Sequence, residues 1–219
     1  RTRNRPLAAG LVRPAEALAL AAVLVLAAFA LVLLLNRLTL LLSLVALFLA
    51  VSYPFTKRFF SLPQAYLGVA FGISIPMAFA AHHGAVPAVA WVMLLANVLW
   101  AIAYDTAYAM VDREDDLRIG VRSSAILFGR HDVAAVMICH AAFLAIMAGV
   151  GAWQQLGALY YAGLALAAAL VAHQYRLIRG RERARCFAAF LHNNWVGAAI
   201  FAGLALDIFV RHHLLQAAR

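Results

Sequence analysis

Charged side chains are scarce in this sequence. Asp, Glu, Lys and Arg make up 12% of its 219 residues, whereas hydrophobic residues make up 66%. A soluble domain is about half apolar and about a quarter charged. The composition therefore excludes an ordinary soluble enzyme. It predicts an all-α, polytopic transmembrane helical bundle, because backbone polar groups in lipid must be paired within the spanning structure.

Cysteine is nearly absent as well. The two cysteines, Cys139 and Cys186, lie in different segments without CxxC spacing, which argues against a disulfide framework or a zinc site. A Walker-type glycine loop and a GxGxxG fingerprint are also missing, so nucleotide hydrolysis is not indicated. The sequence opens on Arg1 and has no signal-peptide pattern, and we expect it to begin inside a longer protein.

Long apolar runs are plentiful, and they divide the chain into seven predicted spans. Their approximate limits are 15–35, 39–53, 63–82, 87–112, 132–152, 157–175 and 187–209. Pro76 lies inside the third span and is expected to kink it. Gly68 and Gly72 form a GxxxG pattern on the same span, which we interpret as ordinary close helix packing.

Lys and Arg fall in alternate connections between these spans. The N-terminal segment and the connections after the second, fourth and sixth spans carry 15 of the 18 basic residues. The positive-inside rule places that set in the cytoplasm. We therefore predict a multi-pass protein of a bacterial inner (cytoplasmic) membrane with its C-terminus on the far face. Topology also explains the net charge of +9, which removes the case for nucleic-acid binding.

The nine acidic residues are unevenly placed, and five of them fall between positions 105 and 116. Asp105, Asp112 and Asp116 are spaced i, i+7 and i+11, so on a helix they lie within roughly 40° of one another. Asp105 is about 10 Å deeper than Asp112. Carboxylates at the edge of a membrane are costly and usually functional. Three on one stripe suggest a divalent cation and an anionic substrate held through it.

Mg²⁺ is the cation that this pattern favours, since it binds oxygen ligands through one or two carboxylates together with substrate phosphates. Asp112 and Asp116, at i and i+4, suit that role. Glu114, Asp115 and Asp116 are open to the simpler interpretation of a solvated helix end. Phosphate also attracts direct cations. The basic loops supply five candidates, which are Arg1, Arg5, Lys57, Arg58 and Arg122.

At this point the sequence resembles a known family. The run YDTAYAMVDREDD at 104–116, followed by IGVRSSAILFG at 119–129, is similar to the second Asp-rich motif of the UbiA-type intramembrane prenyltransferases, in particular the 4-hydroxybenzoate polyprenyltransferase branch. Further stretches agree with it: RTRNRPL at 1–7, YPFTKR at 53–58, GISIPMAFA at 72–80, RERARCF at 181–187 and NNWVG at 193–197. The resemblance covers essentially the whole chain, as a single domain over 1–219.

The resemblance implies a nine-helix bundle with two Asp-rich motifs facing each other across a cavity. Seven helices and the second motif are present here, so the first motif and two helices are expected upstream, and the fragment alone is expected to be inactive. The implied reaction moves a polyprenyl group from polyprenyl diphosphate to 4-hydroxybenzoate, at ring position 3, on the path to ubiquinone. Mg²⁺ is the implied cofactor, and membrane lipid surrounds the protein.

The resemblance also implies roles for particular residues. Asp112 and Asp116 are expected to hold Mg²⁺, and Asp105 to support the site or accept a proton from the aromatic acceptor. Tyr108 is expected to line the path of the allylic cation. Lys57 is expected to serve the diphosphate, and Arg58 to pair with the benzoate carboxylate.

Two alternatives stay open. One is a UbiA-type transferase with another acceptor, such as a naphthoate, homogentisate or a haem. The other is a cation-conducting membrane protein, although that class places acidic residues on several helices through the bilayer. Isoprenoid length and oligomeric state cannot be read from the sequence.

Overall fold

The computed structural model describes residues 4–217, and the part it describes is helical with no strand. Its elements are α1 (Pro14–Val32), α2 (Arg37–Thr56), α3 (Pro63–Gly72), α4 (Ser74–His83), α5 (Ala88–Ile119), α6 (Ser124–Phe128), the 3₁₀ turn η1 (Gly129–His131), α7 (Asp132–Trp153), α8 (Ala158–Ile178) and α9 (Arg183–Ala217). The predicted all-α bundle is confirmed. Each of the seven predicted spans corresponds to a long helix, once α3 and α4 are counted as one interrupted span.

Within the described residues, six of these spans are long and apolar enough to cross a membrane, and α8 falls outside that set. Two helices are longer than predicted. α5 continues to Ile119 instead of ending near 112, and α9 begins at Arg183 instead of near 187. Hydropathy marks only the apolar part of a helix, whereas hydrogen bonding carries the helix on into its charged end. α5 stops at Gly120, whose φ of 71° is left-handed.

The predicted kink in the third span is a break between α3 and α4 at Ile73. Pro76 has no backbone N–H, so it cannot donate to the carbonyl of Gly72 one turn earlier. The turn between α1 and α2 is tied to the far end of α4. Asn36 caps α2 by accepting from the Thr39 N–H at 3.0 Å, and its amide donates to the Ala80 carbonyl at 2.5 Å.

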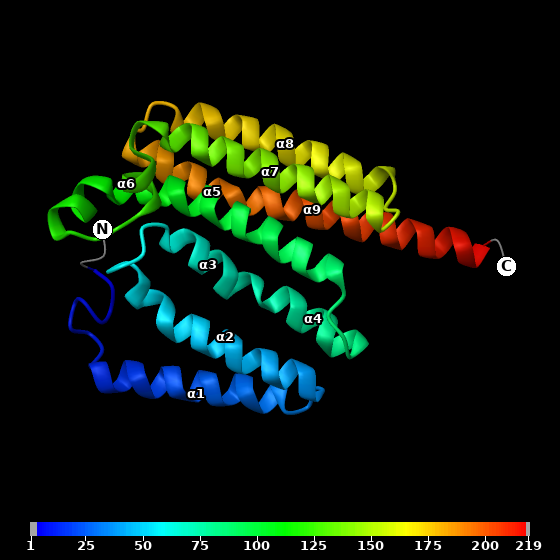
Figure 1. Ribbon diagram of the computed structural model, residues 1–219, viewed down its shortest axis with the longest axis horizontal. Helices are drawn as coiled ribbons and strands as arrows, with labels where there is room; N and C mark the ends of the chain where they lie inside the picture. The colour runs from blue at the N-terminus through cyan, green and yellow to red at the C-terminus, as the bar shows by residue number, and fades with distance from the viewer. Residues whose placement is uncertain (1–3, 218–219) are drawn as a thin grey trace.

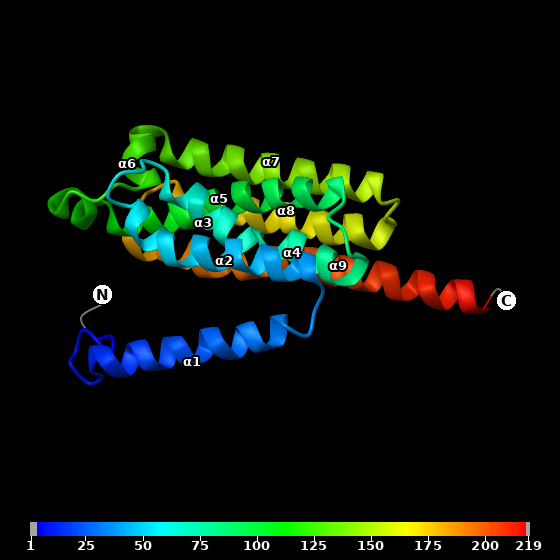
Figure 2. The same cartoon turned by 60° about the horizontal axis from the view of Figure 1, so that its bottom comes forward.

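The long helices run roughly antiparallel, with α5 between α3 on one side and α7 and α9 on the other (Figure 1). α8 packs along α9, and α1 lies at the outside of the bundle, where it contacts α2 (Figure 2). Two apolar clusters fill the interior. One surrounds Met110, Val136 and Ile178 near the α6 end, and the other surrounds Phe143 and Val196 farther along.

The connections also alternate as predicted. Figure 1 shows the α2–α3, α5–α7 and α8–α9 connections at one end of the molecule and the C-terminal end of α9 at the other. The three connections that carry the clustered Lys and Arg therefore share one end of the bundle. Cys139 and Cys186 are free thiols.

Glycines set the closest helix contacts. A Cβ added at Gly68 would lie 2.7 Å from the Val98 Cα, and one added at Gly72 would lie 2.8 Å from the Asn97 Nδ2. The packing interpretation of this pair is confirmed, and its partner is α5. A second close approach joins α8 and α9, where a Cβ at Gly163 would lie 2.6 Å from the Ala199 carbonyl oxygen. The sequence analysis did not identify that contact.

Gly68→Ala should destabilise the protein because the new methyl group meets the α5 backbone, which cannot swing aside as a side chain can. We expect a lower Tm in detergent, corresponding to about 1–3 kcal/mol. Gly149→Ala is the matched control, since Gly149 lies on a helix with nothing within 4 Å of an added Cβ. That variant should unfold at the same or a slightly higher temperature. Equal losses in both variants would contradict the close α3–α5 contact.

Candidate functional site

The acidic stripe lies where the sequence predicts it, along one face of α5. Asp105, Asp112 and Asp116 are each partly buried, although they stand at different depths. Glu114 and Asp115 are exposed at the end of the helix, and the Glu114 carboxylate pairs with Arg183 of α9 at 2.8 Å. The solvated-end interpretation is therefore correct for these two residues, and the other three carboxylates form the stripe.

Lys57 faces this stripe from the C-terminal end of α2. It lies close enough to act electrostatically on both Asp105 and Asp116, and Asp112 acts on the same two groups. The Gln64 side chain, in the first turn of α3, lies close enough to Asp105 to act on it as well. Four of the predicted site residues are thus brought together from two helices that are distant in sequence.

The α5–α7 connection closes over this group of residues. Arg122 donates its backbone N–H to the Lys57 carbonyl at 3.1 Å and its guanidinium to the Phe59 carbonyl at 2.6 Å. Ser124 donates its backbone N–H to the Gln64 Oε1 at 3.1 Å, and its hydroxyl accepts from Thr106 at 2.7 Å. Arg122 therefore fixes a loop beside Lys57, a role that the sequence did not predict.

The remaining predicted cations are placed differently. Arg58 is exposed and its guanidinium stands 5.8 Å from the centre of the Phe55 ring. Arg5 is exposed and lines a groove with residues of α1, among them Glu16 and Leu20. Arg1 lies outside the described residues. The structure does not bring Arg5 or Arg58 to the stripe.

Aromatic side chains extend the site toward the middle of the bundle. Tyr108 lies 4.8 Å from Phe190 of α9, measured between ring centres, and Tyr104 makes an edge contact with Trp100 at 5.8 Å. A cavity of about 420 Å³ opens beside them, with Phe71, Asn97, Trp100, Tyr104, Phe190, Leu191, Asn193 and Asn194 as its lining. The helix period places Asn97, Tyr104 and Tyr108 on one polar arc that faces a cavity or another helix, and Asn97 and Tyr104 do line this cavity; the other lining residues were not predicted. The i, i+4, i+8 spacing of 100, 104 and 108 was the available signal for the α5 part.

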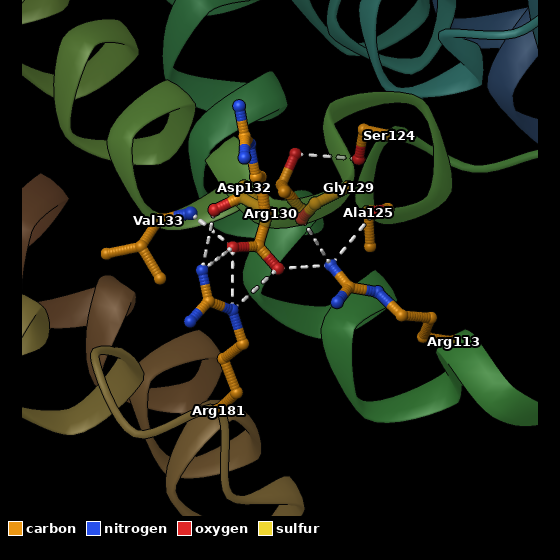
Figure 3. Close-up of polar contacts among 9 residues, drawn as sticks. Arg113, Ser124, Ala125, Gly129, Arg130, Asp132, Val133 and Arg181 are labelled. Atoms are coloured by element: carbon orange, nitrogen blue, oxygen red, sulfur yellow. Dashed lines mark hydrogen bonds and ion pairs between the residues drawn. The ribbon is translucent and has the colours of Figure 1, made fainter.

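A second group of charges lies next to the stripe and was also missed. Asp132, at the start of α7, is fully buried and binds both Arg113 and Arg181 (Figure 3). The sequence gives only single charges at these three positions, each in a different connection or helix end. Nothing in their spacing indicates that they meet.

The carboxylate oxygens near Lys57 are the kind of ligand that a hard cation prefers. Among the described residues, no three His, Cys, Asp or Glu side chains gather around one point, so a metal cage made by protein alone is not formed there. Asp112 and Asp116 supply two carboxylates on one helix face, and the buried Ser123 hydroxyl, which lies near Asp116, has no hydrogen-bond partner in the described part of the chain. Such a set fits Mg²⁺, which keeps several waters and completes its shell with substrate phosphates.

Comparison with known proteins gives a consistent result. The model of the family described as "UbiA prenyltransferase family" matches residues 1–202. A protein of Nitrosospira multiformis named 4-hydroxybenzoate octaprenyltransferase is 65% identical over 96% of this chain and 73% of its own length. Proteins of the same name from Azoarcus sp. and Cupriavidus necator are each 64% identical over 96% of this chain, and over 73% and 74% of their own lengths.

Solved structures agree on the fold. The apo structure of a UbiA homolog from Aeropyrum pernix superposes with a TM-score of 0.83 at 31% identity, over 95% of this chain and 78% of that one. A digeranylgeranylglyceryl phosphate synthase gives a TM-score of 0.68 at 16% identity, over 94% of this chain and 75% of that one, a likeness of fold alone. From the matched residues and the identity to these relatives, the chain belongs to the UbiA prenyltransferase family.

Proposed function

We propose that this protein transfers a polyprenyl group from a polyprenyl diphosphate to 4-hydroxybenzoate and forms a carbon–carbon bond at ring position 3, a step of ubiquinone biosynthesis. The observation that carries the proposal is the stripe of Asp105, Asp112 and Asp116 facing Lys57, on the helix that also supplies Trp100 and Tyr104 to an aromatic-lined cavity. The names of the relatives support the choice of 4-hydroxybenzoate over other aromatic acceptors.

Asp112 and Asp116 are the residues proposed to hold Mg²⁺, because they present two oxygen donors at i and i+4. When bound, Mg²⁺ would neutralise charge on the diphosphate and so stabilise its departure. Lys57, which acts electrostatically on Asp116, is the residue proposed to hold the diphosphate directly. Its ammonium group is a compact charge that suits a phosphate oxygen.

The reaction breaks the bond between the allylic carbon and the diphosphate oxygen, and the electron pair leaves with the diphosphate. The ring carbon ortho to the phenol oxygen then bonds to the allylic carbon, and the proton on that ring carbon must leave. Asp105 lies deeper than Asp112 on the same face, and it is the carboxylate proposed to accept this proton. The Gln64 side chain lies beside it and can donate to the carboxylate.

The cavity beyond Asp105 is proposed to hold the reacting carbon and the isoprenoid tail. The faces of Tyr104, Tyr108 and Phe190 are suited to positive charge on the allylic carbon, since aromatic rings attract cations to their faces. The apolar walls favour an isoprenoid chain, because each buried CH₂ contributes about 0.8 kcal/mol. A site poor in water also protects the cation from hydrolysis.

The proposed location is a bacterial inner membrane, with the site facing the cytoplasm and lipid around the helices. The three clustered basic connections share the end of the bundle that carries the stripe. The positive-inside rule assigns such an end to the cytoplasm.

Asp112→Ala in the full-length protein should abolish Mg²⁺-dependent transfer of a polyprenyl group to 4-hydroxybenzoate, because one of the two proposed metal ligands is lost. The measurement is product formation in membranes, with and without chelator. Asp115→Asn is the matched control, since it removes a neighbouring but exposed carboxylate and should keep most of the activity. Wild-type turnover by Asp112→Ala would end the metal assignment. Membranes that transfer only to another aromatic acid would replace the proposed acceptor.

Arg58→Ala should raise the KM for 4-hydroxybenzoate more than the KM for the diphosphate, if Arg58 binds the benzoate carboxylate. A bidentate Arg–carboxylate contact contributes about 1.5–3 kcal/mol, so the rise should be about tenfold or more. Lys57→Ala should instead raise the KM for the diphosphate more than the KM for 4-hydroxybenzoate. Equal effects of Arg58→Ala on both substrates would remove its assigned role.

A further inference from the structure

Asp132 is the most completely enclosed charge among the described residues. Its exposed fraction is 0%, and its carboxylate accepts from Arg181 at 2.8 Å and from the Val133 N–H at 2.6 Å. Arg113 donates to the second oxygen of the same carboxylate. Figure 3 shows the two guanidinium groups converging on Asp132 from different parts of the chain.

This cluster joins three segments at the same end of the bundle. Arg113 belongs to the last turns of α5, Asp132 begins α7, and Arg181 lies in the turn between α8 and α9. Arg181 adopts a left-handed φ of 56° and donates to the Arg130 carbonyl at 2.8 Å. A non-glycine residue holds such a backbone conformation only where its surroundings enforce it. The turn is therefore shaped around the carboxylate.

The cluster is also connected to the proposed catalytic site. Arg113 follows Asp112 directly, and its guanidinium donates to the carbonyls of Ala125 at 2.8 Å and Gly129 at 3.3 Å. These carbonyls lie in α6 and at its end. The first residue of α6 is Ser124, which binds Gln64 and Thr106 beside the stripe. One side of α6 is thus fixed by Arg113 and the other by the site.

We infer that Asp132 is a positioning residue for the transferase site. By holding Arg113 it fixes the end of α5 that carries Asp112 and Asp116, and it fixes α6 and the loop that brings Arg122 to Lys57. Asp132 itself touches no substrate group. The inference rests on the proposed function for its kinetic consequence, but the structural link is testable without it.

Asp207 provides a matched control at the opposite end of the molecule. It is also buried, with an exposed fraction of 4%, and it binds Arg211 at 3.0 Å and the Gly157 N–H at 2.8 Å. Asp207→Asn and Asp132→Asn each remove one buried carboxylate that binds arginine and a backbone N–H. Both should lower the Tm, since a buried ion pair that loses one partner leaves an uncompensated charge.

The two variants should differ in where the structure loosens. Hydrogen–deuterium exchange in detergent should rise over residues 112–131 in Asp132→Asn and over residues 154–160 in Asp207→Asn. Asp132→Asn should also lower kcat/KM for the polyprenyl diphosphate by about 10- to 100-fold, as expected when catalytic groups are misplaced. Asp207→Asn should keep its kcat/KM for the polyprenyl diphosphate within about threefold of wild type when activity is divided by the amount of folded protein. Dividing by folded protein removes any effect that comes only from lower stability.

Exchange over 112–131 that matches wild type in Asp132→Asn would overturn the inference, as would equal kinetic losses in both variants. If Asp132→Asn does not accumulate as folded protein, Arg181→Gln replaces it, because that side chain is partly exposed and Arg113 still binds Asp132. Its exchange over 112–131 should rise in the same way, and unchanged exchange there would count against the inference. If the wild-type protein transfers no prenyl group, the proposed function fails, whereas the exchange comparison still decides the structural link.

Discussion

Charges in this bundle must be compensated within the protein, because the lipid around the helices offers no water to solvate them. Asp132 meets this requirement with two arginines and a backbone N–H, and Asp207 meets it with Arg211 and the Gly157 N–H. The arginines of Asp132 and the Gly157 N–H that binds Asp207 come from segments far apart in sequence, whereas Arg211 lies one turn from Asp207 on α9. Compensation of buried charge therefore also determines how the connections at the two ends of the bundle are held.

The stripe on α5 satisfies the same constraint in a different way. Three carboxylates lie in sequence order along one helix face, and Lys57 reaches two of them. The Asp132 cluster has more cations than carboxylates, whereas the stripe has more carboxylates than the lysine beside it. An arrangement of the second kind favours a divalent cation, and through it an anionic substrate. The two clusters are thus complementary, one holding the structure and one available for chemistry.

Close helix packing brings the parts of the site to one place. Gly68 and Gly72 let α3 approach α5, which carries Gln64 to Asp105, and the α8–α9 contact at Gly163 fixes the helix that supplies Phe190. In lipid, small residues permit such contacts because association depends on van der Waals packing and not on burial from water. The aromatic cavity lies between α5 and α9, so it depends on how these two helices are held relative to each other.

The sequence by itself determined the helical class, the number of spans, the alternation of basic connections and the stripe of Asp105, Asp112 and Asp116, because hydropathy and the period of a helix are local properties. Tertiary structure alone decided that Lys57 joins the stripe while Arg58 points outward, although they are neighbours in sequence. It likewise decided that Arg113, Asp132 and Arg181 meet. Contacts between distant segments depend on how helices pack and how connections fold back, and no short stretch of sequence contains that information.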